Sequence, residues 1–354
     1  MPAIKPSTYA RSSRTSIEAL TKIAAVLHVY ELSALNMPHS GQLQGGLFNS
    51  KTAYPSTDGQ CQQISGTSEG ASMLKIVVLL KQTFDTEEKI IVTPAGVDER
   101  DAKFVINPYD EYALEEAIRQ REQLGGEVIV ITCGAERSQE VLRTALAIGA
   151  DEAIRLDSAD LSDDSSAVAA ALAAVIRPLA PDLLLAGLFA VDSGAGSVAL
   201  QIAELLHLPH AASAVKVTIL TAGELGSLPA DGLLSSPTAG GAERYALVER
   251  DVEGDTETVS IPLPALITAQ QGLNEPRYPS LPGIMKAKRK PLRTITAAEL
   301  IASGELSLES VSPRTARTQL LPPPPRAAGK RLPGDPAEQA AALVSLLREE
   351  AKLL

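Results

Sequence analysis

Tryptophan is absent from this 354-residue sequence, and aromatic residues make up only 3% of it. Since hydrophobic residues still reach 45%, the core must be built from Val, Leu, Ile and Ala. The two cysteines, Cys61 and Cys133, are too few for a disulfide framework and fit a reducing compartment. The cysteines and the four histidines show no metal-ligand spacing, and no Ser, His and Asp grouping indicates a catalytic nucleophile.

Long apolar runs and an excess of basic charge are also lacking. No apolar run reaches the roughly 18 to 20 residues of a membrane-spanning helix, and the start of the chain does not resemble a secretory signal. The net charge of −11 argues against nucleic-acid binding, because phosphate neutralisation needs a broad basic face and only residues 286–293 are densely basic. These absences predict a cytoplasmic protein with no nucleic-acid partner and no direct membrane insertion.

The character of the sequence changes at residue 73. Residues 1–72 are polar, rich in Ser, Gly and Gln, and aperiodic apart from one possible short helix at 16–35. We expect this stretch to be disordered or to lie upstream of the true start codon, with a regulatory extension as the alternative. The folded domain is expected at 73–292.

Short apolar, β-branched runs alternate with helical patterns from residue 73 onward. The expected strands are 75–81, 127–134, 152–157 and 181–188, and the expected helices are 110–124, 138–149, 164–179 and 195–208. Such alternation predicts an α/β fold, a parallel sheet with helices on both faces. Ligands of such sheets bind beyond the carboxyl ends of the strands.

The pattern then changes, and the runs at 214–220, 244–252, 257–263 and 265–270 predict a small antiparallel meander, interrupted by a surface loop at roughly 221–242. Residues 293–354 are expected to form an extended C-terminal arm, because "LLPPPPRAAGKRLPGDP" favours polyproline-type structure. The arm ends in an amphipathic helix. An apolar helix face so far from its own domain predicts contact with a partner subunit.

Two stretches could hold a nucleotide. In "VINPYDEYALEEA", Asn107 is a good N-cap and Pro108 occupies the first helical position, so the segment is either a well-capped helix or a loop that helps to hold a base. In "GLFAVDSGAGSVALQ", small residues lead from a strand into a helix, which indicates either a phosphate cradle or a plain Gly-rich turn. The lysine of a P-loop is missing, which favours a nucleotide that is bound but not hydrolysed.

Cys133, at the end of an apolar strand, is more typical of a small core residue than of a nucleophile.

Five segments together resemble the β subunit of electron transfer flavoproteins. They are "KIVVLLKQTFDTEEKI", "INPYDEYALEEA", "LRTALAIGADEAI", "FAVDSGAGSVALQIAELL" and "LNEPRYPSLPGIMKAKRKP", and the likeness covers about residues 73–292. The resemblance implies a nucleotide-binding domain similar to the adenine nucleotide alpha hydrolase fold. It also implies a heterodimer with an α subunit, in which the β subunit binds AMP structurally and FAD lies mainly on the α subunit.

The family's function follows from the same resemblance. Such complexes accept electrons from acyl-CoA dehydrogenases in fatty acid β-oxidation and pass them to a membrane quinone oxidoreductase, so the β chain is expected to be an electron-carrier subunit and no enzyme. Carried over to matching positions, the AMP contacts are Leu79, Asn107, Pro108, Tyr109, Asp110, Val130, Gly187, Asp192, Ser193, Gly194, Ala195, Gly196 and Ser197.

The segment at about 269–290 is similar to the family's recognition loop, with Leu281 at the position that enters an apolar pocket of the dehydrogenase. A single buried leucine is worth roughly 1.5 to 3 kcal/mol, which suits a transient contact. A structural crossover loop is the alternative. The other expected docking residues are Tyr278, Pro282, Ile284, Met285 and Lys286. Asp251 matches an acidic residue that pairs across the subunit interface, or is simply part of an acidic hairpin turn.

The phosphate loop departs from the family's common "D-G-D-T-A-Q-V-G". Here it reads "DSGAGSVA", with Gly194 in place of an acid, Ser197 in place of Gln and Ala199 in place of Gly. Backbone contacts to phosphate survive such changes, whereas side-chain contacts do not. Two alternatives therefore stay open: an electron-bifurcating member with a second FAD in the β-subunit site, and an ATP-binding enzyme of the same fold.

Overall fold

The computed structural model describes residues 73–93, 96–227, 242–322, 324 and 329–353. The expectation for residues 1–72 lies outside the described residues, as does most of the loop expected at 221–242. The described start of that loop forms the short helix α6 (Ala222–Gly226).

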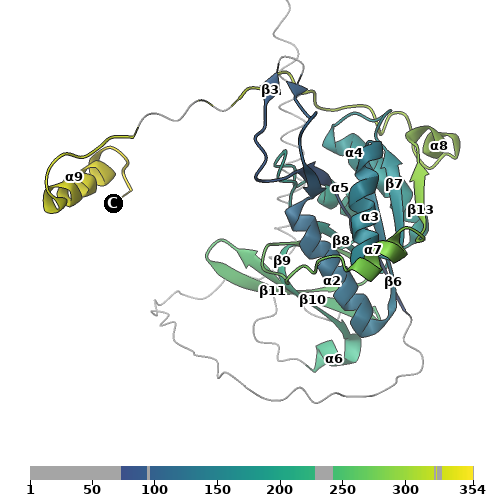
Figure 1. Ribbon diagram of the computed structural model, residues 1–354. Helices are drawn as coiled ribbons and strands as arrows, with labels where there is room; N and C mark the ends of the chain where they lie inside the picture. Colours follow the sequence, from purple (N-terminus) through teal and green to yellow (C-terminus); the bar gives the residue numbers. More distant parts are fainter. Residues whose placement is uncertain (1–72, 94–95, 228–241, 323, 325–328, 354) are drawn as a thin grey trace, which may run out of the picture. The chain divides into compact units, whose positions relative to one another are not determined.

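One nine-stranded sheet organises the described part of the chain, in the order β11-β10-β9-β12-β8-β1-β6-β7-β13 (Figure 1). Every pair from β9 to β13 in this order is parallel, and only β10 and β11 run antiparallel to their neighbours. The strands are β1 (Leu74–Leu79), β6 (Gly126–Gly134), β7 (Glu152–Asp157), β8 (Leu183–Gly187), β9 (His210–Thr221), β10 (Arg244–Val252), β11 (Asp255–Pro262), β12 (Ala265–Ala269) and β13 (Leu292–Ile295). The predicted α/β class is confirmed.

Helices cover both faces of the sheet because the central strands bury alternate residues in two separate clusters. Ile76 and Val78 of β1 pack in one cluster with α2 (Pro108–Leu124) and α3 (Gln139–Ile148). Val77 and Leu79 pack in the other with α4 (Ser165–Ile176) and α5 (Val198–Leu205). The twofold period of a strand thus separates the two apolar layers.

The expected antiparallel meander is wrong for residues 265–270. Strand β12 enters the sheet between β8 and β9 and runs parallel to both. All five of its residues are buried, and an apolar run without polar alternation is typical of a central parallel strand. The hairpin β10–β11 and its pairing with β9 are antiparallel, as expected.

Residues just past 292, expected to belong to the arm, continue the sheet. Strand β13 pairs in parallel with β7, and Leu300 in helix α8 (Ala297–Ala302) and Leu306 after it are buried. Further on, α9 (Pro336–Glu349) begins with a capping box formed by Asp335 and Glu338, and none of its described residues is buried. The domain boundaries themselves stay a prediction.

Smaller elements lie outside the main sheet. They are β2 (Gln82–Phe84), β3 (Val92–Thr93), β4 (Gly96–Val97), β5 (Phe104–Ile106), the 3-10 turns η1 (Glu136–Ser138) and η2 (Arg177–Leu179), and α7 (Leu281–Ala287). No helix in the described ranges is both long and apolar enough to span a bilayer.

Candidate functional site

A cavity of about 540 Å³ lies at the carboxyl ends of β1, β6 and β8. Its floor includes Leu79 and Lys81 after β1, Cys133 of β6 and Gly187 of β8. The chain leaves β1 for β6 on one side and later returns to place β8 on the other, so this is where the strand order reverses. Doubly wound sheets bind ligands at such a point.

Asp110 ties the ends of two strands together beneath the cavity. Its carboxylate accepts hydrogen bonds from the backbone N–H of Lys81 at 2.6 Å and of Gly187 at 3.1 Å. A Cβ added at Gly187 would lie 2.2 Å from the Asp110 Oδ1, so only glycine fits there. Burial raises the pKa of Asp110 to about 7, while hydrogen bonds from Asn107 and the two backbone groups act in the opposite direction.

Asn107 precedes α2 but does not cap it by a side-chain hydrogen bond. Its Nδ2 donates to the Phe189 carbonyl at 2.9 Å and to Asp110 at 3.0 Å, and its Oδ1 accepts from the Val191 N–H at 3.1 Å. The simple interpretation of "NPYD" as a capped helix is therefore wrong in its detail. The Asn107 side chain is turned toward the loop after β8, which it holds against the cavity.

The loop between β8 and α5 is stabilised by its own contacts. Lys81 Nζ lies 2.7 Å from Asp192 Oδ1 and 3.2 Å from Ser193 Oγ. The N–H of Gly194 donates to the Ala190 carbonyl at 2.8 Å, with Gly194 at a φ of +66° that favours glycine. Among the described residues no side chain caps the start of α5. The first N–H groups of that helix therefore remain available to an anion in the cavity.

The structure brings most of the predicted nucleotide residues to this cavity. Those that line it are Leu79, Asn107, Asp110, Gly187, Ser193, Ala195 and Gly196. Those that lie outside the lining are Pro108 and Tyr109, at the start of α2, and Asp192, Gly194 and Ser197, in the loop before α5. Val130 lies inside β6 and is fully buried in the sheet. Contact of any of these residues with a ligand stays a prediction.

Sequence reasoning missed several lining residues. Lys81 lies just after the end of β1, and Cys133 is the second-last residue of β6, so the rule about carboxyl ends could have found them. Burial raises the pKa of the Cys133 thiol to about 12, which leaves it a poor nucleophile. Asp163, after β7, and Arg317, from the C-terminal segment, also line the cavity. No local sequence signal marks Arg317, because it lies far along the chain from the other residues that line the cavity.

A second feature is an apolar surface on and beside α7, which we call the α7 crown: Tyr278, Leu281, Ile284 and Met285. The exposed fractions of these four residues are 92%, 73%, 44% and 67%, respectively. Ser280 caps the helix by accepting a hydrogen bond from the Gly283 N–H at 3.1 Å. The crown therefore presents apolar side chains to solvent from an ordered helix.

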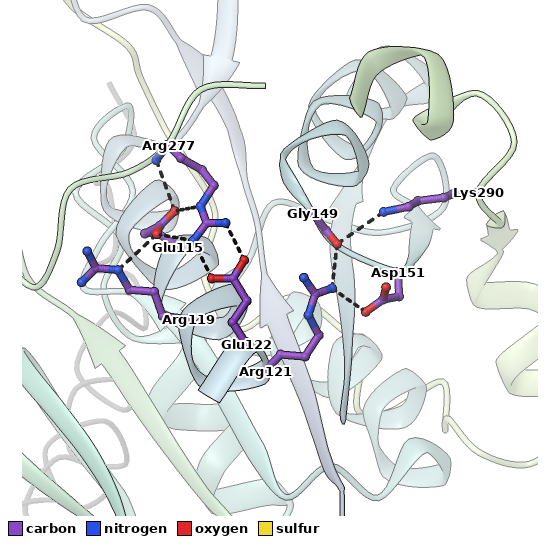
Figure 2. Close-up of polar contacts among 8 residues, drawn as sticks. All are labelled: Glu115, Arg119, Arg121, Glu122, Gly149, Asp151, Arg277 and Lys290. Atoms are coloured by element: carbon purple, nitrogen blue, oxygen red, sulfur yellow. Dashed lines mark hydrogen bonds and ion pairs between the residues drawn. The ribbon is translucent and has the colours of Figure 1, made fainter. Parts of the chain in front are cut away.

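The segment before α7 is fastened to α2 by Arg277 (Figure 2). Its guanidinium lies 2.9 and 3.0 Å from the two carboxylate oxygens of Glu115, and 2.7 and 3.0 Å from those of Glu122. Hydrogen bonds to Glu122 and Glu115 raise the pKa of Arg277 further above its usual range, and Arg277 lowers that of Glu122. The Asn274 Nδ2 adds a bond to the Tyr112 carbonyl at 3.0 Å.

The segment after α7 is fastened to the end of α3. Lys290 Nζ donates to the carbonyls of Leu146, Gly149 and Ala150 at 3.1, 3.3 and 2.5 Å (the Gly149 bond is drawn in Figure 2). A cation at this helix end suits the negative pole of its dipole. Within α7, a Cβ at Gly283 would come 2.3 Å from the Ala147 carbonyl oxygen, so the two helices pack directly on their backbones. The crown is therefore held at both ends and from beneath.

The other predicted residues lie on or near these surfaces. Pro282 and Lys286 belong to α7. Asp251 is exposed near the end of the β10–β11 hairpin, with Gln270 Nε2 at 3.5 Å. Within the described ranges no group of three or more His, Cys, Asp or Glu side chains could hold a metal ion.

Comparisons with known proteins identify a family and several relatives of this chain. The family model described as "Electron transfer flavoprotein domain" matches residues 95–300. The "Electron transfer flavoprotein subunit beta" of Bacillus subtilis is 43% identical over 283 residues, covering 79% of this chain and 100% of that protein. The protein of the same name from Syntrophomonas wolfei is 36% identical over 281 residues, covering 79% and 98%. That from Mus musculus is 33% identical over 286 residues, covering 79% and 99%.

Proposed function

The chain belongs to the electron transfer flavoprotein family as a beta subunit, and we propose that it pairs with an alpha subunit to carry electrons from dehydrogenases to a membrane quinone oxidoreductase. Acyl-CoA dehydrogenases of fatty acid β-oxidation are the proposed donors, and the cytoplasm is the proposed location. The chain itself performs no bond chemistry in this proposal. FAD, held mainly by the alpha subunit, supplies one- and two-electron transfer when bound.

The observation that carries this proposal is the α7 crown. Three exposed apolar side chains on α7, and Tyr278 just before it, belong to a segment that is fastened on both sides, at Arg277 and at Lys290. A preordered apolar contact loses little entropy on docking, and its small size suits rapid exchange between dehydrogenases. Leu281, with 73% of its surface exposed, is the proposed anchor.

We propose that the cavity binds AMP in a structural role. Its volume of about 540 Å³ falls in the usual range of small-molecule sites. At Gly196 a Cβ would lie only 3.1 Å from the Leu188 carbonyl oxygen, so the backbone forms the cavity wall here without a side chain. The uncapped start of α5 and the loop backbone at 192–197 before it would take the phosphate, through N–H groups other than those of Ser193 and Gly194, which donate to the Ala190 carbonyl.

Asp251 is the proposed contact of this chain with the flavin-bearing alpha subunit. It is exposed near the tip of a two-stranded hairpin, where an acidic side chain can reach a basic group of a partner. The apolar residues of α9, including Leu343 and Val344 with 48% and 44% of their surface exposed, form the second proposed contact.

Nucleotide content tests the proposal directly. The chain is co-expressed with its alpha subunit, the complex is purified and denatured, and the released nucleotides are quantified by chromatography. One FAD and one AMP per heterodimer is the expected result. Two FAD and no AMP would replace the simple carrier with a bifurcating member of the family, and a complex without flavin would overturn the electron-carrier function.

A further inference from the structure

The C-terminal segment crosses the edge of the nucleotide cavity. We call residues 312–317 the C-terminal strap. Just before it, Val311 packs against the apolar cluster that includes α4, α5 and α8. Within it, the backbone N–H and the hydroxyl of Thr315 both donate to Asp164 Oδ2, at 2.9 and 2.5 Å. The strap is thus bound to the loop in front of α4.

The Asp164 carboxylate is a firm attachment point because both of its oxygens are engaged. While Oδ2 takes the two bonds from Thr315, Oδ1 caps α4 by accepting from the N–H groups of Ser166 and Ala167 at 3.0 and 3.1 Å. Asp164 is 3% exposed. Hydrogen bonds from the hydroxyls of Ser166 and Thr315 hold its pKa well below the usual range, so it is ionised at neutral pH.

Arg317 lies two residues beyond this attachment and lines the cavity. Its guanidinium pairs with Asp163 Oδ2 at 2.7 Å, and the two side chains are 59% and 68% exposed. An ion pair so open to water contributes little stability. Breaking the ion pair with Asp163 therefore costs little free energy, and the Arg317 side chain can bind a stronger anionic partner instead.

Two other charged side chains that line the cavity, Lys81 and Asp110, have bonding partners that are less exposed than Asp163. Lys81 is bound to Asp192 and Ser193 of the loop after β8. The Asp110 carboxylate is occupied by N–H donors beneath the floor. Of the basic side chains that line the cavity within the described chain, Arg317 is the one with an exposed and replaceable partner.

We propose that Arg317, delivered by the C-terminal strap, binds the phosphate of the nucleotide in this cavity and selects for a phosphorylated ligand. A guanidinium can offer two parallel N–H donors to a phosphate, in contrast to the point charge of lysine. The inference rests on the proposed binding of AMP, and it adds to the loop before α5 a second phosphate contact, from a side chain outside the nucleotide domain's own loops.

The test compares AMP with adenosine, which differ only by the phosphate. Both are titrated calorimetrically into the nucleotide-free complex of this chain with its alpha subunit. We expect Arg317→Ala to weaken AMP binding at least tenfold and to leave adenosine binding within twofold of the unsubstituted complex. Arg314→Ala is the matched control: Arg314 lies in the same strap, is exposed, and makes no hydrogen bond or ion pair to the described residues. It should change neither affinity.

A second variant separates phosphate binding from a structural role of the ion pair. Asp163→Asn breaks the pair with Arg317 but leaves the guanidinium in place, so AMP affinity should stay equal or rise. An equal loss of AMP affinity in Asp163→Asn and Arg317→Ala would overturn the inference, as would equal loss of AMP and adenosine binding in Arg317→Ala. A complex that binds neither ligand before substitution would overturn the proposed AMP site as well.

Discussion

Replacing Arg277 by methionine should destabilise the protein more than an ordinary surface substitution. Methionine keeps much of the length of the aliphatic stem but removes every guanidinium contact to Glu115 and Glu122. The Glu115 side chain is only 3% exposed, so its charge would stay in place without its main partner. Removing one partner of a buried pair typically costs about 3 to 5 kcal/mol.

Two features of the site place the expected loss near the lower end of that range. Arg119 Nε still donates to Glu115 at 3.2 Å, and the backbone N–H of residue 277 still reaches the same carboxylate at 3.2 Å. The contact with Glu122, whose side chain is 48% exposed, adds at most about 1 kcal/mol. We therefore expect Arg277→Met to lower the free energy of unfolding by about 3 kcal/mol.

Urea unfolding of the complex at low salt and fixed protein concentration measures this loss without screening the charges. Two controls accompany it. Glu122→Gln should cost less than about 1 kcal/mol, and Arg277→Met combined with Glu115→Gln should recover most of the loss, because no buried charge is then left unpaired. If the single variant were as stable as the unsubstituted chain, or the double variant no better than the single, the assignment of Arg277 as the anchor of this segment would be refuted.

Three further predictions follow from the same contacts. Leu281→Ala should weaken docking to a dehydrogenase about ten- to hundredfold with unchanged flavin content, measured as the concentration dependence of electron acceptance, whereas Leu308→Ala, 70% exposed elsewhere, should have no effect. Asp164→Ala should cost about 1 to 2 kcal/mol of unfolding free energy at pH 7. That difference should shrink as the pH falls below about 4, because the unfolded residue then takes up a proton while the lowered pKa keeps the folded one ionised, so the stabilisation is lost progressively until the folded residue is protonated too. Cys133 lines the cavity and is partly exposed, but with its pKa raised to about 12 it should react slowly with iodoacetamide at pH 8 in the folded complex and rapidly in urea; rapid labelling of the folded complex would contradict the raised pKa.

The pattern of apolar residues was sufficient to predict the central sheet, because β1, β6 and β8 are apolar on both faces and are separated by well-formed helices. The direction of β12 was not predictable in the same way. Its sequence, "ALITA", fits a strand of either direction, and its parallel pairing with β8 and β9 depends on the path by which the chain re-enters the sheet. Strand β13 is four residues long with a half-buried pattern, which is too weak a signal to separate it from an arm.

The residues of the candidate site also fall into a group that could be predicted from sequence and a group that could not. Residues in two local segments, around Asn107 and after Gly187, were predictable because strand-to-loop-to-helix transitions are visible in sequence. The side-chain role of Asn107 was not, since its partners Phe189 and Val191 lie more than 80 positions away. The same holds for Arg317, which reaches the cavity only because Thr315 binds Asp164, 151 positions earlier. Contacts between distant segments produce no periodic pattern in the sequence, so they could not be predicted from it.

Helix α2 connects the two proposed functional regions of the protein. Its first turn carries Asp110, which joins the ends of β1 and β8 under the cavity, and its later turns carry Glu115 and Glu122, which hold the segment before the α7 crown. A ligand that binds only the folded cavity stabilises the native state by mass action, and here that state includes the start of α2. If the cavity holds the proposed nucleotide, a ligand that undergoes no chemistry would still support the proposed docking surface, because the helix that it helps to order is the one that holds the segment before the α7 crown.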